Sequence, residues 1–324
     1  MLRYLVKRII ILIPVIIAIT IVLFAISKMM PGDQVRAMIP NTLKQEQYQL
    51  AYDSAYQRLG LDKSLPEQYV RWVYDILING ELGYSSMFNR PVADSIGQPL
   101  TNTIILNVFV NFVYLAIALP VGIRMATKRG SLFDNGWQVF SLIAYSLPSF
   151  FLALSLIYIF GITLGWLPLG GMPNSSLLSG VPLYLSWARH LVLPVATLTI
   201  ISLASAMRYI RNAMIDALSQ DYIRTARSKG LREKVVIYSH AFRNALIPIS
   251  TIIVFTLFAL FIGSPITESV FQYNGIGKML VSAVNQRDTM MVVSMNLIFA
   301  MVNVTAVLIA DIIYGLVDPR IKLS

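Results

Sequence analysis

The sequence contains no cysteine and little charge. Among its 324 residues, Asp, Glu, Lys and Arg together make up 13%, whereas soluble domains carry roughly 25%. Without cysteine the chain has no disulfide framework, no thiolate metal site and no cysteine nucleophile. The shortage of charge excludes a soluble domain, a disordered chain and a nucleic-acid-binding protein, although the net charge is +10. With 56% hydrophobic residues, the composition is that of an integral membrane protein.

The sequence also lacks the motifs of common catalytic and metal sites. No GxxxxGK[ST] motif occurs, because Gly277-Lys278 is followed by Met279, so this chain does not bind ATP through a P-loop. Its two histidines, His190 and His240, stand in no zinc motif, and we expect both to be helix-boundary residues. Serines near membrane depth have no histidine base close by. We therefore expect no enzyme activity, and no metal or cofactor bound by this chain alone.

Long uncharged stretches predict six transmembrane helices. A bilayer core of ~30 Å needs about 20 apolar residues per helix, and such stretches occur at 9–27, 95–123, 190–207, 244–267 and 289–310. A further charge-free stretch, 135–188, is too long for one helix and contains several glycines and prolines from Gly161 onward. We predict one span at 137–160 followed by a loop, which gives an all-α integral membrane protein.

The first span follows three basic residues, as a secretory signal does. Its apolar stretch, 9–26, is longer than the ~7–15 residues of a signal peptide, and no clear cleavage site follows. We predict a retained helix, with a signal peptide as the alternative.

Basic residues concentrate on one side of the predicted spans. The segments on that side hold sixteen Lys and Arg residues and comprise 1–8, 124–134, 208–243 and 317–324. The short opposite loops, 162–188 and 268–288, hold only Lys278 and Arg287. By the positive-inside rule, both termini are predicted to be cytoplasmic.

The outer segment 28–97 carries helix signals. Tyr48, Tyr52 and Tyr56 recur at helical spacing before Gly60. Ser64-Leu65-Pro66-Glu67 reads as a capping box that opens a helix ending at Asn79-Gly80. The residues expected to face inward on that helix are Tyr69, Val73, Ile76 and Leu77. We predict a small helical subdomain that either receives a partner protein or braces the bundle.

The segment 208–248 lies between the fourth and fifth spans. Asp221 suits a helix start, Lys229 stands at the helix end, and Gly230 permits the left-handed turn that stops it. Small or apolar residues would let a partner surface approach the backbone, namely Ala217, Ile223 and Ala226. The pattern predicts a short, rigid, basic helix that projects from the membrane. The alternative is a solvated loop whose basic residues touch anionic lipid.

This segment resembles the cytoplasmic loop of binding-protein-dependent ABC importer permeases, closest to the branch serving dipeptides, oligopeptides, glutathione and nickel. The resemblance covers almost the whole chain, with matching motifs at 1–4, 30–33, 82–85, 90–92, 165–168, 190–194, 268–271, 275–277, 287–288 and 318–320. The sequence departs from the family pattern at Arg224-Thr225-Ala226, where the broad family has Glu-Ala-Ala, and at Tyr273-Asn274 and Thr289.

The resemblance implies a type I importer permease with six transmembrane helices. Its parts would be an extra N-terminal helix (1–27), an outer helical subdomain (28–97), a transmembrane domain (98–317) and a cytoplasmic tail (318–324). The spans of that domain would be 98–123, 137–160, 189–208, 246–267 and 289–315, with a coupling loop at 209–245. The residues that would couple to the ATPase are Asp221, Tyr222, Arg224, Thr225, Ala226, Ser228, Lys229 and Gly230.

The resemblance also implies partners in a bacterial or archaeal cytoplasmic membrane. These are a second, homologous permease, two cytoplasmic ATPases that hold ATP and magnesium, and an external solute-binding protein. The cargo is expected to be a di- or oligopeptide, with nickel or glutathione as alternatives.

Four asparagines are candidates for the path through the membrane. Asn107 and Asn111 lie at i,i+4 in the second span, and Asn296 and Asn303 at i,i+7 in the sixth. Same-face polar residues either line a cavity or bond helices together, and we favour interhelical bonding.

The competing functional class is an ion-coupled secondary transporter or a channel. Carriers of that kind need buried ionisable groups, and the spans contain only Asp311. We predict that Asp311 is a structural acid paired with Arg208 or Arg243; a proton relay is the alternative.

Overall fold

The computed structural model describes residues 2–30, 34–39, 43–173, 177 and 179–317. The predicted tail 318–324 and most of the motif at 30–33 lie outside these residues. The chain forms two compact units, one from residues 1–102 and 275–308, the other from 103–274 and 309–324. Each unit is described by itself.

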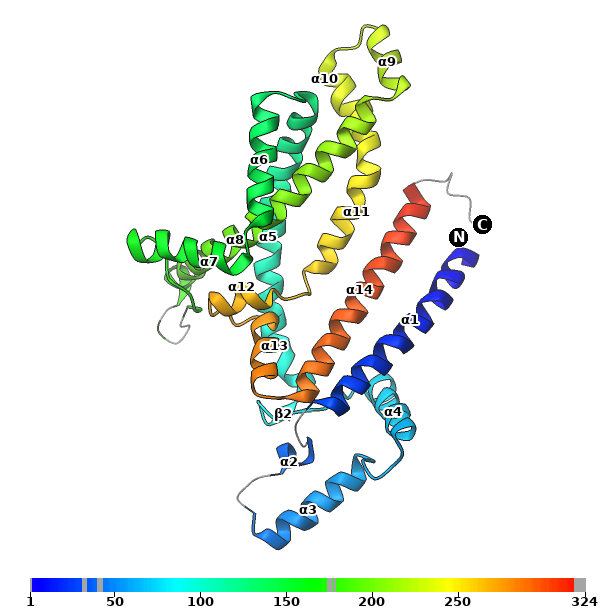
Figure 1. Ribbon diagram of the computed structural model, residues 1–324, viewed down its shortest axis with the longest axis vertical. Helices are drawn as coiled ribbons and strands as arrows, with labels where there is room; N and C mark the ends of the chain where they lie inside the picture. The colour runs from blue at the N-terminus through cyan, green and yellow to red at the C-terminus, as the bar shows by residue number, and fades with distance from the viewer. Residues whose placement is uncertain (1, 31–33, 40–42, 174–176, 178, 318–324) are drawn as a thin grey trace. The chain divides into compact units, whose positions relative to one another are not determined.

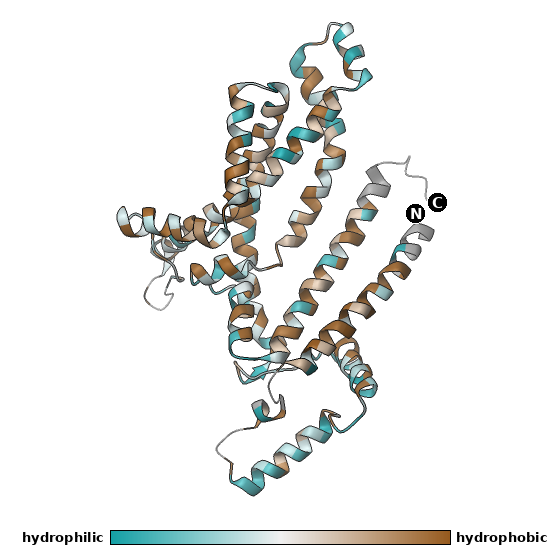
Figure 2. Ribbon diagram, in the orientation of Figure 1, coloured by the Kyte–Doolittle hydropathy of each residue, from teal (hydrophilic) through white to brown (hydrophobic). Residues whose placement is uncertain are grey.

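The first unit contains several short helices, a two-stranded hairpin and longer helical segments (Figure 1). Its elements are α1 (Leu2–Met29), α2 (Gln34–Met38), α3 (Gln45–Arg58), α4 (Leu65–Tyr74), the π-helical turn η1 (Asp75–Asn79), β1 (Tyr84–Ser85), β2 (Arg90–Pro91), the start of α5 (Val92–Thr127), α13 (Ile276–Asn285) and most of α14 (Thr289–Val317). Figure 2 shows hydrophobic residues along α1 and α14 and hydrophilic ones along α3.

The second unit is a helical bundle (Figure 1). It contains the rest of α5, α6 (Leu132–Ser146), α7 (Ser149–Leu156), the π-helical η2 (Ile157–Thr163), α8 (Gly180–Leu218), α9 (Asp221–Ser228), α10 (Glu233–Val235), the π-helical η3 (Val236–Phe242), α11 (Arg243–Ala259) and α12 (Pro265–Val270). Buried residues of α5, α8, α9, η3 and α11 form one core cluster.

Five described helices are long and apolar enough to cross a membrane, and a bent pair gives a sixth span if its two parts count as one. The bent pair corrects the predicted straight span 137–160. α6 and the helix from Ser149 to Thr163 meet at 103°, and the break falls at Leu147-Pro148. Leu147 has extended backbone angles, as expected of a residue before proline, because the proline ring disfavours the helical conformation there.

The helix that contains the fourth predicted span, 189–208, is longer than that span. α8 runs from Gly180 to Leu218, so His190 lies inside a helix and not at its boundary; its Nδ1 is 2.8 Å from the carbonyl oxygen of Ser186. A helix of 39 residues is about 58 Å long at ~1.5 Å per residue, nearly twice a bilayer core of ~30 Å. The helix therefore extends beyond the hydrocarbon and shortens the predicted loop 209–245.

α4 braces α1 in the first unit. The hydroxyls of Tyr69 and Thr20 are 2.9 Å apart, and Tyr69 and Trp72 both contact the ring of Phe24. The predicted start of α4 is confirmed, because the backbone N–H of Ser64 donates to the Glu67 carboxylate. Leu77, expected to face inward, is 73% exposed. α3 has no buried residue, whereas Val35 of α2 and the nearby Ile39 are buried.

The motif 82–85 is held against the start of α14. The hairpin pairs Ser85 with Arg90, and the fully buried Asp288 accepts hydrogen bonds from the Ser85 hydroxyl and the Met87 N–H. Ser294 donates to the carbonyl of Leu82. The motifs 82–85 and 287–288 thus form one buried polar cluster, although Ser85 and Asp288 are 203 residues apart in the sequence.

The motif 268–271 forms a second buried brace. The Glu268 carboxylate is fully buried and accepts hydrogen bonds from the Thr103 hydroxyl at 3.0 Å and the Ser264 N–H at 3.1 Å. The carbonyl of Phe271 accepts from Gly171 N–H at 2.7 Å. Burial, and then the negative charge of Glu268, raise the pKa of Tyr273, so its hydroxyl stays protonated.

Candidate functional site

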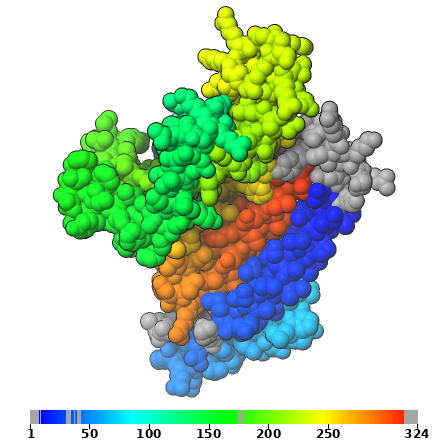
Figure 3. Space-filling view, turned by 45° about the horizontal axis from the view of Figure 1, so that its top comes forward, coloured from blue at the N-terminus to red at the C-terminus, as the bar shows by residue number. Residues whose placement is uncertain are grey.

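The segment between α8 and α11 contains the predicted short helix. α9 begins at Asp221 and ends at Ser228, with Lys229 as its C-cap and Gly230 at φ +74°. These bounds confirm the expected start at an acidic residue and the expected stop at a left-handed glycine. In the ribbon and space-filling views α9 and α10 project beyond the ends of α5 and α6 (Figures 1 and 3).

Buried side chains anchor α9 to its own bundle. Ile223 is fully buried and Ala226 nearly so, in the cluster that also contains Val236 and Ala241 of η3. The expectation that Ala217, Ile223 and Ala226 offer a partner close access to the backbone is therefore wrong, because intramolecular packing covers all three. Apolar residues at this spacing indicate a buried helix face.

An ion pair closes the turn after α9. The Arg227 guanidinium donates to both carboxylate oxygens of Glu233, at 2.6 and 3.2 Å. Neither residue was singled out from the sequence. Together with Ile223, the pair holds α9 at its middle and at its C-terminal end.

The other face of α9 is exposed. Among the residues predicted to couple, all but Ala226 are exposed: Asp221, Tyr222, Arg224, Thr225, Ser228, Lys229 and Gly230. Asp221 and Arg224 form an i,i+3 pair at 3.6 Å with side chains 96% and 80% exposed. Partial burial raises the pKa of the Tyr222 hydroxyl, while a hydrogen bond with Asn244 acts in the opposite direction. The coupling role of this face stays a prediction.

A buried ion pair ties α8 to the start of α6. The Arg211 Nε and Nη2 atoms lie 2.6 and 2.8 Å from the two carboxylate oxygens of Asp134. Asp134 is fully buried and also accepts from the N–H of Gly130 at 2.9 Å. The bidentate geometry fixes the turn between α5 and α6 against α8, ten residues before α9 begins.

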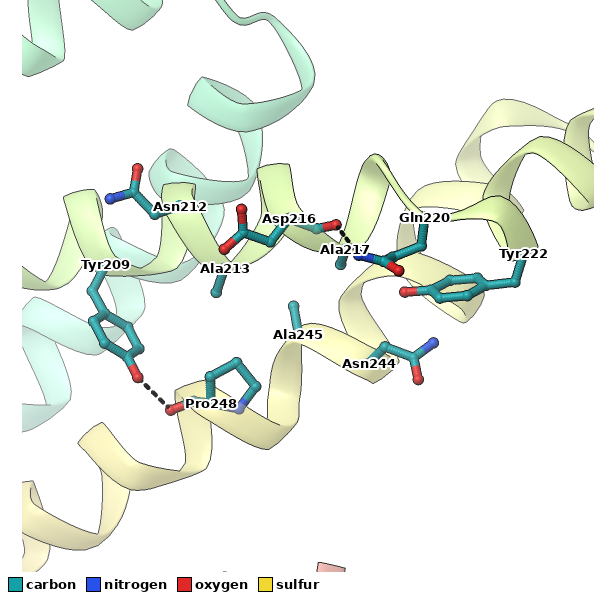
Figure 4. Close-up of a pocket in the computed structure, with 10 residues that line it drawn as sticks. All are labelled: Tyr209, Asn212, Ala213, Asp216, Ala217, Gln220, Tyr222, Asn244, Ala245 and Pro248. Carbon is teal, nitrogen blue, oxygen red and sulfur yellow. Dashed lines mark hydrogen bonds between the residues drawn. The ribbon is translucent and has the colours of Figure 1, made fainter. Parts of the chain in front are cut away.

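A hollow of about 500 Å³ lies between the end of α8, the start of α9 and α11 (Figure 4). At one end of this hollow the Tyr209 hydroxyl on α8 donates to the carbonyl of Pro248 on α11 at 3.1 Å. The other lining residues are mostly polar or small: Asn212, Ala213, Asp216, Ala217, Gln220, Tyr222, Asn244 and Ala245.

A second hollow, of about 490 Å³, lies between α5, α8 and α11 and shares Tyr209 with the first. Hydroxyl and amide side chains line much of it, among them Asn111, Tyr114, Ser202, Ser205, Thr251 and Thr256. None of its described lining residues carries a charge.

The four asparagines predicted for the path make two kinds of hydrogen bond. Asn107 donates to the carbonyls of Ala259, Leu260 and Ile262, and Asn111 donates to the carbonyl of Thr256. These bonds confirm interhelical bonding for the first pair.

Asn296 and Asn303 are different, because each donates to a carbonyl four residues earlier in α14, that of Val292 and that of Phe299. The expectation of interhelical bonding is wrong for this second pair. Of the four asparagines, only Asn111 is among the residues lining the second hollow.

Comparison with known proteins decides the family. Residues 118–323 match the family of binding-protein-dependent transport system inner membrane components, and residues 1–119 match the N-terminal family of the same membrane components. The chain belongs to this family. As such an inner membrane component it is a multi-pass, non-catalytic permease subunit of a binding-protein-dependent ABC importer.

Several named permeases are similar over their full length. The permease is 36% identical to the di/tripeptide transport system permease protein DppB of Pseudomonas aeruginosa, over 99% of both chains. It is 34% identical to the oligopeptide transport system permease protein AppB of Bacillus subtilis, over 99% of this chain and 100% of the other. It is 33% identical to the dipeptide transport system permease protein DppB of Escherichia coli K12, over 99% of both.

Asp311 lies near the end of α14 and is partly buried. Arg208, one of its predicted partners, donates to the carbonyl of Ala204 and lies over the ring of Tyr145, 5.2 Å from its centroid. A structural role for Asp311 in the permease stays a prediction.

The residues of α8 that line the two hollows were not predicted from the sequence, although they share one signal. Polar residues recur along one face of α8 in the permease, at Ser202, Ser205, Tyr209, Asn212 and Asp216. A search for i,i+3 and i,i+4 spacing that included serine and tyrosine would have found this stripe. No such signal points to the pairing of Asp134 with Arg211, because 77 residues separate them.

Proposed function

We propose that this permease takes up peptides and forms one half of the membrane path together with a second, homologous permease. The observation that carries the proposal is full-length similarity, at 33–36% identity, to permeases named for dipeptides, di/tripeptides and oligopeptides. The second hollow supports it, because its described lining combines hydroxyl and amide groups with apolar side chains and carries no charge. Such a surface suits a peptide backbone and selects little among side chains, which leaves recognition to an external binding protein.

We propose that the exposed face of α9 docks on one of two cytoplasmic ATPases, which bind ATP and magnesium. Its stop at the left-handed Gly230 and its buried Ile223 support this role, because a helix that transmits force must move with its own bundle. The asymmetry of basic residues supports a cytoplasmic position for α9 and for both termini. ATP binding would draw the two coupling helices together and open the path outward, and hydrolysis would reset it.

Reconstitution tests the function. The assembled complex is placed in proteoliposomes with its cognate binding protein, and ATP hydrolysis and uptake are measured for di- and oligopeptides, glutathione and nickel. Peptides are expected to stimulate both activities. Stimulation by nickel or glutathione alone, or uptake that follows the proton gradient at constant ATP, would overturn the proposal.

Replacement of Gly230 tests the coupling role. Gly230 has φ +74°, and a side chain there would meet no atom within 4 Å, so only the backbone conformation resists substitution. A left-handed conformation costs a β-branched residue on the order of 1–2 kcal/mol. We expect Gly230→Val to lower uptake about tenfold, the change that ~1.4 kcal/mol produces.

Gly230→Asn is the matched control, because asparagine adopts the left-handed conformation more readily. It should keep most of the uptake. A fully assembled Gly230→Val complex with normal uptake would show that the geometry of this turn does not matter for coupling.

A further inference from the structure

One face of α8 carries a continuous polar stripe. Ser202, Ser205, Tyr209, Asn212 and Asp216 follow one another at intervals of three or four residues, so they share one side of the helix. All five line one or both of the hollows beside α8. At ~1.5 Å per residue the stripe is about 21 Å long.

α11 presents a matching stripe. Asn244, Pro248, Thr251 and Phe255 have the same spacing and line the same two hollows. The bond from Tyr209 to the Pro248 carbonyl links the two helices (Figure 4). Because Tyr209 lines both hollows, they adjoin one another, and together they are called the track along α8 and α11.

Asp216 is the one charged residue among the described residues that line this track. It is exposed, and within the described residues its carboxylate has no ion-pair partner. The nearest arginines of α8 are engaged elsewhere, Arg211 with Asp134 and Arg208 over Tyr145. The lining at the end of the track next to α9 thus carries one carboxylate, whereas the rest of the lining is uncharged.

The surroundings of Asp216 suit a primary ammonium group, which donates three hydrogen bonds. The amide side chains of Asn212, Gln220 and Asn244 line the same hollow. Asn212 Oδ1 already accepts from Arg211 and Asn244 bonds with Tyr222, whereas the Gln220 amide nitrogen donates to the Asp216 carbonyl and leaves its oxygen as an acceptor. Pro248 has no N–H, so the carbonyl of Asn244 receives no α-helical bond from it. A carboxylate with neutral oxygen acceptors around it is a site for a cation.

We propose that the stripes of α8 and α11 are this chain's side of the peptide path, and that Asp216 binds the protonated amino terminus of the peptide at its cytoplasmic end. The inference rests on the proposed peptide transport and adds the contact residues. The uncharged part of the track would bind the peptide backbone without selecting among side chains, while Asp216 orients the free amino terminus.

Photolabelling of the assembled complex without its binding protein and without ATP tests the site directly. The probe is trialanine carrying a photoreactive diazirine, and labelled residues are mapped by mass spectrometry. Labels are expected within residues 202–220 and 244–255. Unlabelled trialanine should compete at least about tenfold better than N-acetyl-trialanine, because acetylation removes the ammonium charge.

Substitutions of Asp216 identify the carboxylate. Asp216→Asn should reduce the preference for the free amine to less than about threefold, and Asp216→Glu should restore it. Glu46→Gln, which removes an exposed acid on α3, should change nothing. Labels confined to other segments, or an unchanged preference in Asp216→Asn, would overturn the inference.

Two outcomes separate this inference from the proposed function. If peptides fail to stimulate ATP hydrolysis by the native complex with its binding protein, the proposed function fails and the inference with it. If peptides stimulate hydrolysis but labelling avoids the track, the inference alone fails.

Discussion

Arg211→Ala is expected to destabilise the permease by about 3–5 kcal/mol, the usual cost of leaving a buried carboxylate without its partner. Asp134 is fully buried, and the Arg211 side chain is only 14% exposed. The other groups that bond to Asp134 are the N–H of Gly130 and the side chain of Gln138, and neither carries the positive charge of the guanidinium. The apparent melting temperature of the purified complex, and the yield of assembled complex, should both fall.

A matched control and a double variant sharpen this test. Arg224→Ala removes an ion pair that is longer, at 3.6 Å, and lies in solvent, and exposed pairs contribute little; the melting temperature of this variant should stay near that of the native protein. Asp134→Leu combined with Arg211→Met should be more stable than either single variant, because the double change leaves no unpaired buried charge. Equal effects of Arg211→Ala and Arg224→Ala would show that burial of the pair does not matter.

The helices that the sequence predicts well are those with local signals at their ends. α4 starts directly after Ser64, whose N–H donates to the Glu67 carboxylate, and η1 stops before Gly80, which has φ +67°. α9 likewise follows from Asp221 and Gly230. In each case the start or stop depends on bonds within a few residues, which a sequence displays directly.

The bend at Leu147-Pro148 and the length of α8 were not predicted, for two different reasons. A charge-free stretch shows which residues can lie in the bilayer, but it does not show where the chain changes direction. The predicted straight span 137–160 therefore includes Pro148, where the chain bends. Conversely, α8 continues beyond the apolar stretch with polar residues, because a helix with polar side chains is stable in water. Hydropathy thus locates the bilayer and not the helix ends.

Much of the candidate site depends on contacts distant in sequence. The exposure of Arg224 and Lys229 agrees with a coupling face, whereas the burial of Ile223 and Ala226 reverses the role assigned to them. Apolar residues on a short helix are compatible with internal or external packing, and only the positions of α8 and η3 decide between the two. The same holds for Asp134, whose partner is on another helix.

Asp288→Ala is expected to destabilise the first unit by several kcal/mol. Asp288 is fully buried at the start of α14 and accepts three hydrogen bonds: from the Ser85 hydroxyl, from Met87 N–H at 3.0 Å and from Met291 N–H at 3.0 Å. Alanine removes every acceptor at once, and each donor left unsatisfied in the interior costs about 1–3 kcal/mol. The bond from Met291 N–H is the N-cap bond of α14, and loss of such a cap alone costs about 1 kcal/mol.

Two measurements check this prediction. The apparent melting temperature should fall, and limited proteolysis should cut the hairpin between Leu82 and Pro91 faster, because Asp288 holds that segment. Asp94→Ala is the matched control: Asp94 also stands in the first turn of a helix but is exposed, so its loss should cost less than about 1 kcal/mol. Asp288→Asn should be intermediate, since an amide keeps one acceptor oxygen. A melting temperature for Asp288→Ala equal to that of Asp94→Ala would mean that the three bonds contribute nothing to stability.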